Sequence, residues 1–439
     1  MTSKYELRLQ GRTHTTVSTR HRLLAPAPFP AFISVLYSIL CCLCLPCRKK
    51  TRDLGQKSKK ARSTDVYDYR NVDMEKVYGR LKKRRVSQVP SVFEIFPCQW
   101  TPESASHIRN GDNSVDCTLK GGYAEVKWWQ TFNEPASFVA GYSGNTAIAP
   151  AINSSGVGDY MAAYTLLKAH AAAYRLYDEQ YRATQQGKVG ITINVMWYEP
   201  ATDAQADIDA AERKNQFYAG LYGHPIFTSE GDYPAVVKQR VAENSQAGGY
   251  PRSRLIEFTP EEVEYIKGTA DFFGLNHYTS YPTTEGVSGS NPSMDLDAGA
   301  VAGDYTDYPL AASSWLRSVP WGFRKTLNWL VQQYPGYPIF VMENGWSDTG
   351  ELDDQGRIDY YGAYLAEMLN AMNEDGVPVI GYTAWSLLDN FEWGTGFTTR
   401  FGLHYVDITD PDRKRTPKAS SRFLEEIFRT KTLPAKYMI

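Results

Sequence analysis

From residue 121 onward the chain alternates short strand-like runs with longer helix-like ones, and this alternation constrains its fold more than any other feature. The strand-like runs are rich in β-branched and aromatic residues, and the longer segments repeat apolar residues at helical spacing. We expect five strands, at residues 126–132, 188–197, 270–277, 338–343 and 378–386. We expect helices at residues 159–184, 204–220, 321–334, 360–374 and 418–429, with a further one opening at Thr259. The alternation predicts an α/β fold in which helices pack outside a parallel sheet.

Two of the expected helix starts carry capping residues. Asp159 opens the first long helix, where its carboxylate could accept a backbone N–H. At the start near Thr259, the threonine is followed by Pro260 and two glutamates, an order preferred at helix N-termini. Both patterns predict that a helix begins at the residue that follows the cap.

The first 89 residues differ in character, and we expect a leader, an apolar segment and a basic linker that are mostly disordered. Residues 31–47 are uncharged and could form a helix that spans a membrane once, although the unbroken apolar core is only about 15 residues long. An unstructured leader is the alternative interpretation. Basic runs at 57–60 and 82–85 are typical of a solvated linker, with a nuclear-localisation signal or an anionic-lipid contact as alternatives.

Composition argues against some classes of function. The formal net charge is -2, so the charge balance gives no indication of nucleic-acid binding. Aromatic residues make up 13% of the chain, which fits either an aromatic-rich core or rings that stack on sugars. Cys44 and Cys47 have the CxxC spacing of a zinc site, but no second ligand pair accompanies them, so we expect no metal.

Two glutamates lie where expected strands end. Glu134 directly follows the strand at 126–132, and Glu343 ends the strand at 338–343. The carboxyl ends of parallel strands meet at one edge of a sheet, which is where barrel enzymes carry their catalytic groups. Cleavage of a glycosidic bond needs such a pair of carboxyl groups, although by spacing alone each could be an ordinary surface acid.

The sequence around these glutamates resembles glycoside hydrolase family 1. Thr131–Pro135 is similar to the acid/base signature of that family, and Glu343–Gly345 is similar to its nucleophile signature. Asn276–Tyr278 and Trp385–Trp393 resemble two further motifs, found on its sixth and eighth strands. The resemblance implies a (β/α)8 barrel and retaining, β-glucosidase-like hydrolysis of β-glycosides or oligosaccharides. It implies no cofactor, and it leaves the preferred sugar, the aglycone and the oligomeric state open.

The family assigns roles to residues that match its motifs. Glu134 would be the general acid and then the general base, with a raised pKa, and Glu343 would be the nucleophile, ionised at rest. Tyr278 would orient Glu343, unless it is simply a buried core tyrosine. The resemblance implies that the sugar is contacted by Asn133, Asn276, Tyr278, Trp385, Glu392, Trp393 and Phe401.

Single residue types narrow the substrate class further. A carboxylate at Glu392 would repel a phosphorylated sugar. An acid at Glu134 argues against plant-type thioglucosidases, which lack that acid. His277 could suggest a metal site, but the chain contains no HxH or HExxH pattern, so we expect a core or supporting role.

The chain departs from the family upstream of residue 121. Residues 90–120 resemble only the loop after the first strand of the barrel, and the second and third strands are not recognisable. We therefore expect residues 121–439 to form an incomplete barrel with about five of the eight βα units. A non-catalytic relative or fragment that binds sugar or a protein is the alternative function. The resemblance suggests an extracellular location, with a single membrane span through residues 31–47 as the alternative.

Overall fold

A computed structural model describes residues 126–145 and 147–438. The strands are β1 (Trp128–Asn133), β2 (Lys188–Asn194), β3 (Trp197–Pro200), β4 (Phe272–Asn276), β5 (Ser280–Glu285), β6 (Ala300–Ala302), β7 (Ile339–Asn344), β8 (Val379–Ala384), β9 (His404–Val406) and β10 (Arg415–Pro417). The α-helices are α4 (Pro135–Val139), α5 (Gly158–Gln180), α6 (Arg182–Gln185), α7 (Gln205–Asn215), α8 (Leu221–Phe227), α9 (Ala235–Ala247), α10 (Pro260–Ile266), α11 (Met294–Ala298), α12 (Trp321–Gln333), α13 (Gln355–Asn373) and α14 (Ala419–Thr430).

The main sheet contains the five expected strands. Their order is β1-β2-β4-β7-β8, and every neighbouring pair is parallel. Strands therefore succeed one another along the sheet in the order in which they occur along the chain, as in a (β/α)8 barrel. The described residues form part of such a barrel, so the predicted fold class is confirmed.

Burial differs between the middle and the ends of this sheet. All residues of β4 are buried, whereas most residues of β1 and β8 are only partly buried. Within the described residues, β1 and β8 each pair with one strand. A closed barrel has no such edges, and each edge strand presents backbone N–H and C=O groups that its own sheet leaves unpaired.

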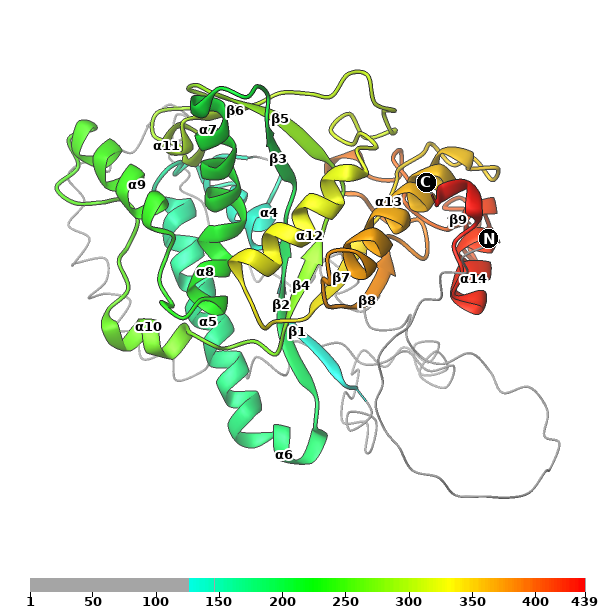
Figure 1. Cartoon of the computed structure of the whole chain (residues 1–439), viewed down its shortest axis with the longest axis horizontal. Helices are drawn as coiled ribbons and strands as arrows, with labels where there is room; N and C mark the ends of the chain where they lie inside the picture. The colour runs from blue at the N-terminus through cyan, green and yellow to red at the C-terminus, as the bar shows by residue number, and fades with distance from the viewer. Residues whose placement is uncertain (1–125, 146, 439) are drawn as a thin grey trace, which may run out of the picture. The chain divides into compact units, whose positions relative to one another are not determined.

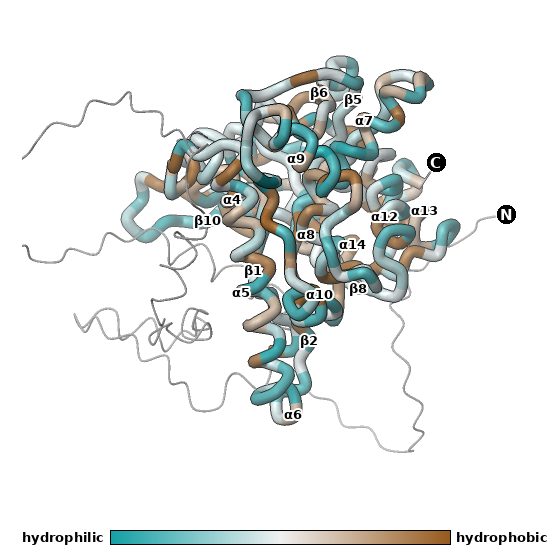
Figure 2. The backbone as a smooth tube through the Cα atoms, turned by 90° about the vertical axis from the view of Figure 1, so that its left-hand side faces the viewer, coloured by the Kyte–Doolittle hydropathy of each residue, from teal (hydrophilic) through white to brown (hydrophobic). Residues whose placement is uncertain are grey.

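The helices form a layer against the strands (Figure 1). Helix α5 contacts β1 and β2, α8 contacts α5, and α12 packs along α13. The core between the layers includes Ile191, Leu275 and Val341 from neighbouring strands, together with Phe323 from α12. In Figure 2, teal stretches mark the more polar helices α9 and α10.

One expected strand is divided in two. The sequence predicts a continuous strand at 188–197, but β2 ends at Asn194 and β3 begins at Trp197. Strand β3 leaves the main sheet and pairs with β5, which pairs in turn with β6. The backbone N–H of Trp197 donates to the carbonyl of Thr279 rather than to a residue of β4, so a new sheet starts there.

Helix starts agree with the sequence in one of two cases. Thr259 caps α10 with a full capping box, in which its hydroxyl accepts from the backbone N–H of Glu262 and Glu262 accepts from the backbone N–H of Thr259. The prediction that Asp159 caps the first long helix is wrong. Val157 holds the capping position, and buried Asp159 accepts from the backbone N–H groups of Gly156 and Tyr160.

Several expectations lie outside the described residues. They include the disordered leader, the apolar run at 31–47, the basic linker and the loop remnant at 90–120. No helix among residues 126–145 and 147–438 has the length and apolar character needed to cross a membrane. The boundary that we place at residue 121 stays a prediction.

Candidate active site

Three strands of the main sheet, β1, β4 and β7, carry polar side chains at their carboxyl ends. Asn133 ends β1, Asn276 ends β4, and Glu343 is the next-to-last residue of β7. The register pairs Asn276 with Glu343 directly, because β4 and β7 are parallel neighbours. The carboxyl ends of all these strands face the same way, so the sequence motifs converge as expected.

Glu134 is placed by an unusual backbone conformation. Its φ is 51° and its ψ is 67°, in the left-handed region, where a non-glycine residue costs about 1–3 kcal/mol. Its backbone N–H donates to the carbonyl of Thr192 on β2 at 2.9 Å, which keeps it against the sheet. The chain then turns directly into α4, with Pro135 at its first position. Conformational strain of this kind is typical of functional residues.

Hydrogen bonds hold both carboxyl groups. The Asn276 Nδ2 donates to Oε1 of Glu134 at 2.8 Å, and its distance to Oδ1 of Asn133 is 3.1 Å. The Asn133 Nδ2 donates to Oε1 of Glu343 at 3.2 Å. Asn276 also acts on Glu343 as a hydrogen-bond partner that lowers the pKa of that carboxyl. The two glutamates therefore flank one asparagine amide, in a single network at the strand ends.

Tyr278 contacts Glu343 through its hydroxyl. The phenol donates to Oε2 of Glu343 at 2.7 Å. Burial, followed by the charges of Glu343 and Glu134, raises the pKa of Tyr278 well above its ordinary value, so the phenol stays a proton donor. Its backbone carbonyl accepts from the hydroxyls of Tyr360 and Tyr364, which fix the main chain independently of the phenol. This geometry favours the orienting role over that of a simple core tyrosine.

Both glutamates have raised pKa values. Burial raises the pKa of Glu134, against hydrogen bonds from Asn276 and Ser137 that lower it. Burial and then the charge of Glu134 raise the pKa of Glu343 well above its ordinary value. No lysine or arginine of the described residues is among the causes that shift the pKa of Glu343. Hydrogen bonds from Tyr278, Asn276 and Asn133 lower the pKa of Glu343 and so favour its ionised form.

Three further predicted sugar contacts come from the segment after β8. Trp385 directly follows that strand, and its side chain hydrogen-bonds Glu392, which lowers the pKa of that carboxyl. Burial and then the charge of Glu134 act more strongly and raise the pKa of Glu392 to about 7. Trp393 is 55% exposed. Glu392 is thus close enough to Glu134 to belong to the same electrostatic site, and Trp393 offers an open ring beside it.

Phe401 and His277 are more completely buried than Glu134 and Glu343. Phe401 is 2% exposed and packs edge-on against Tyr278, with 6.0 Å between ring centroids. It supports Tyr278 in this structure, and its predicted contact with sugar stays a prediction. His277 is fully buried, stacks on Phe323, and lies with Nδ1 2.7 Å from the carbonyl of Val195. Burial lowers the pKa of His277 to about 4, which suits a neutral core residue.

Sequence reasoning missed two supporting residues. The Ser137 hydroxyl donates to Oε2 of Glu134 at 2.8 Å from the first turn of α4. The Tyr382 hydroxyl donates to Oδ1 of Asn344, the residue after Glu343, at 2.7 Å. The spacing of Ser137, three residues beyond Glu134 in an expected turn, could have indicated the first contact. No local pattern could have indicated the second, because it joins two strands.

The described residues contain no group of three or more histidine, cysteine, aspartate or glutamate side chains arranged to hold a metal ion. One buried carboxyl group, Glu343, and one partly buried carboxyl group, Glu134, lie at strand ends and are held by amide and phenol donors, an arrangement typical of glycosidase sites on barrel sheets.

Comparisons with known proteins support this class. The sequence pattern of the family described as "Glycosyl hydrolase family 1" matches residues 117–433. The chain is 44% identical over 307 residues to Myrosinase 1 of Brevicoryne brassicae, a match that covers 70% of this chain and 65% of the relative. It is 39% identical over 319 residues to the human Cytosolic beta-glucosidase, covering 71% of this chain and 66% of the relative.

A solved structure supports the same class of protein. The structure titled "Aphid myrosinase" superposes with a TM-score of 0.67 at 42% identity, over 70% of this chain and 66% of the other. The chain belongs to glycosyl hydrolase family 1. It spans just under two thirds of the length of these relatives.

Proposed function

We propose that this site belongs to a retaining β-glycosidase that acts on terminal β-glucoside-like bonds through Glu134 and Glu343. The observation that carries the proposal is the single hydrogen-bonded network of Glu134, Asn276, Asn133 and Glu343 at the strand ends. Membership of the family supports a glycosyl hydrolase in general terms. The substrate partner is a β-glycoside or an oligosaccharide.

The first step would form a covalent glycosyl-enzyme. Glu343 attacks the anomeric carbon while Glu134 gives its proton to the departing glycosidic oxygen. Burial, which raises the pKa of Glu134, helps this residue to keep that proton near neutral pH. Asn133 would bond the sugar hydroxyl next to the anomeric carbon, and a bond that tightens in the transition state increases the rate.

The second step would release the sugar. Glu134, now ionised, takes a proton from water, and the water oxygen bonds to the anomeric carbon as the bond to Glu343 breaks. Trp385, Glu392 and Trp393 would position the rest of the sugar ring. Correct positioning can contribute several kcal/mol to lowering the barrier.

A non-catalytic sugar-binding role is the second candidate, and one observation favours it. Glu343 must be ionised to attack, but burial and the charge of Glu134 raise its pKa, and none of the groups that shift it within the described residues is a cation. A site of this kind could bind a sugar without cleaving it. In either case the proposal concerns the 439-residue chain.

Labelling with a mechanism-based 2-fluoroglycoside separates the two candidates. Such a compound reacts with the nucleophile but releases it slowly, so the intact mass of the protein rises by one glycosyl unit. Labelling that maps to Glu343 and is absent from the Glu343→Gln variant supports the hydrolase. Binding of the compound without labelling supports the non-catalytic role, and neither binding nor labelling rejects both.

The localisation stays a proposal. One relative is named a cytosolic β-glucosidase, which adds an intracellular alternative to the extracellular location suggested by the family resemblance. The location of the tagged full chain in cells distinguishes these, including the membrane association that residues 31–47 could provide.

A further inference from the structure

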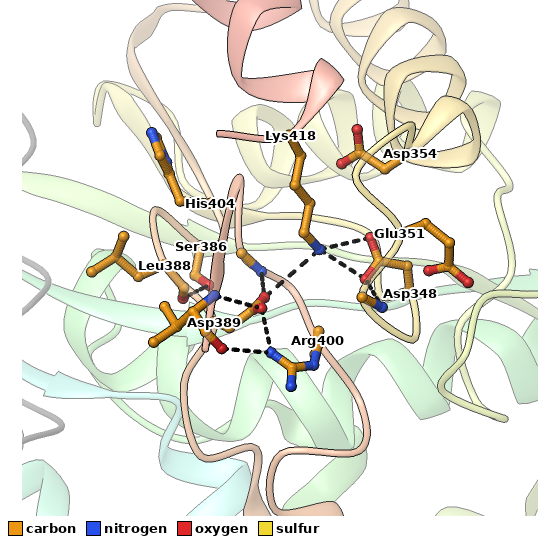
Figure 3. A network of polar contacts seen from close by, with 12 residues as sticks. Asp348, Glu351, Asp354, Ser386, Leu388, Asp389, Arg400, His404 and Lys418 are labelled. Atoms are coloured by element: carbon orange, nitrogen blue, oxygen red, sulfur yellow. Dashed lines mark hydrogen bonds and ion pairs between the residues drawn. The ribbon is translucent and has the colours of Figure 1, made fainter. Parts of the chain in front are cut away.

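A charge-balanced cluster includes residues of the segment that follows β8. It contains three acids and three bases whose side chains are at most 10% exposed, namely Asp348, Asp354, Asp389, Arg357, Arg400 and Lys418. Figure 3 shows Lys418 between Asp348 and Asp389, with Arg400 against the same Asp389. The cluster brings together the segments after β7 and β8 and the start of α14, which are distant in sequence.

Within this cluster, Asp389 and Arg400 close the base of a loop. Arg400 Nη1 donates to Oδ2 of Asp389 at 2.7 Å. The backbone N–H of Asp389 donates to the carbonyl of His404, and that of Leu403 donates to the carbonyl of Ser386. Residues 386–389 therefore run parallel to residues 401–404, and the Asp389–Arg400 contact closes the loop that connects them. We call residues 389 and 400 the neck, and residues 390–399 between them the tip.

The Asp389 carboxylate contacts several groups in addition to Arg400. Besides Arg400 it accepts from the backbone N–H groups of Gly402 at 3.0 Å and Val406 at 3.2 Å. Lys418 Nζ lies 3.7 Å from Oδ1 of the same carboxylate. A side chain at position 402 would put its Cβ 2.2 Å from the Asp389 backbone nitrogen, so this approach requires glycine. Removing the charge of Asp389 would leave two buried cations with fewer partners.

The tip has little packing of its own. Phe391 is 52% exposed, Trp393 55% and Phe397 36%, although Phe391 and Phe397 contact one another edge-on. Inside the tip, the backbone N–H of Glu392 donates to the carbonyl of Gly396. A segment with few buried contacts opens locally unless its ends are fixed. The neck is where this segment is fixed.

We propose that Asp389 and Arg400 are positioning residues that hold the tip, and with it Glu392 and Trp393, at the sugar site. The role in sugar binding rests on the proposed function, but the mechanical role of the neck does not. Asp389 lies within the motif Trp385–Trp393 without being predicted to contact sugar. That motif thus combines sugar-contacting side chains with the residue that fixes them.

Limited proteolysis of the folded full chain with chymotrypsin tests the neck directly. The exposed aromatic residues of the tip are cleavage sites, and cleavage reports how often the tip opens. We expect Asp389→Asn to raise the rate of cleavage at Phe391 and Phe397 at least about tenfold. The matched control is Asp354→Asn, which removes an acid from the same cluster that does not itself contact Asp389 or Arg400 and that pairs with Arg357 and Ser420.

Conservative and disruptive changes at Arg400 provide a second comparison. Arg400→Lys keeps the charge and should keep tip cleavage near the original rate, whereas Arg400→Met should raise it as Asp389→Asn does. The proposal would be overturned if Asp389→Asn and Asp354→Asn raised tip cleavage equally. It would be overturned in particular if each increase only followed the loss of global stability of that variant in urea. An unchanged rate in both Asp389→Asn and Arg400→Met would overturn it as well.

Sugar affinity adds a readout that stability alone would not move. In the Glu343→Gln background, where turnover cannot interfere, Asp389→Asn should weaken binding of para-nitrophenyl β-glucoside at least about tenfold, and Asp354→Asn should leave it unchanged. Equal affinities in these two variants would contradict the sugar-positioning role. If the Glu343→Gln chain binds no glucoside, the proposed function fails, while the proteolysis comparison still decides whether the neck holds the tip.

Discussion

Replacing Glu392 with glutamine should stabilise the protein at neutral and alkaline pH. Burial and the charge of Glu134 raise the pKa of Glu392 from 4.5 to about 7. A carboxyl group whose folded-state pKa is raised binds its proton more tightly when folded, so its contribution to stability decreases as pH rises between these two values. The shift corresponds to about 3 kcal/mol of destabilisation above pH 7, an upper value because Glu392 is not fully enclosed.

The Glu392→Gln variant keeps the shape and an acceptor for the hydrogen bond with Trp385, but it loses the charge. Its free energy of unfolding, measured in urea at pH 5, 6, 7 and 8, should therefore exceed that of the parent chain by an amount that grows from near zero to about 1–3 kcal/mol. Glu425→Gln, an exposed acid on α14, controls for loss of one surface charge. A difference that is flat across this range, or a variant that is less stable at pH 8, would refute the burial argument.

Two further predictions address the nucleophile and the core. Tyr278→Phe removes the hydroxyl that donates to Glu343 at 2.7 Å. A hydrogen bond to a charged group contributes about 1.5–3 kcal/mol, so the rate of 2-fluoroglycoside labelling should fall about 10–150-fold. An unchanged labelling rate would remove Tyr278 from the mechanism. Phe273→Ala opens a cavity beside Phe227 and Tyr334, in a strand that is buried throughout. It should lower the free energy of unfolding, measured in urea, by about 3–5 kcal/mol. A loss below about 1 kcal/mol would contradict the packing described for this strand.

The pattern of apolar residues was sufficient to predict the strands of the main sheet, because each strand is an apolar run bounded by turns. The same reasoning placed Glu134 and Glu343 at strand ends, and the parallel register then explains why Asn276 lies opposite Glu343. Local pattern alone could not divide the segment 188–197 into β2 and β3. That division depends on Thr279, which accepts a hydrogen bond from Trp197 across the fold.

Tertiary contacts also changed the role of individual polar residues. Asp159 has the residue type of a helix cap, but burial beside Arg254 and Asp297 makes it part of an electrostatic cluster instead, and burial raises its pKa to about 6. Asp389 lies in a motif associated with sugar binding, yet its carboxylate faces Arg400 and two backbone amides. In both cases the deciding partners come from other parts of the sequence, so no local spacing predicts them.

From the edge strands of the described sheet and the electrostatics of Glu343 we predict that the 439-residue chain hydrolyses β-glucosides very slowly, although the two proposed catalytic glutamates lie in one hydrogen-bonded network. Strands β1 and β8 have one partner each within the described residues, and the groups that shift the pKa of Glu343 there include no cation. An unpaired edge weakens the sheet that carries the site, and an uncompensated buried carboxylate resists ionisation.

The most direct test is steady-state turnover of para-nitrophenyl β-glucoside by the purified chain, with Glu343→Gln assayed beside it. We expect turnover far below the ordinary enzyme range of roughly 1–1000 per second, with any residual activity absent from the Glu343→Gln control. Turnover within that range by the parent chain, lost in the control, would contradict this prediction and show that Glu343 ionises readily in this chain.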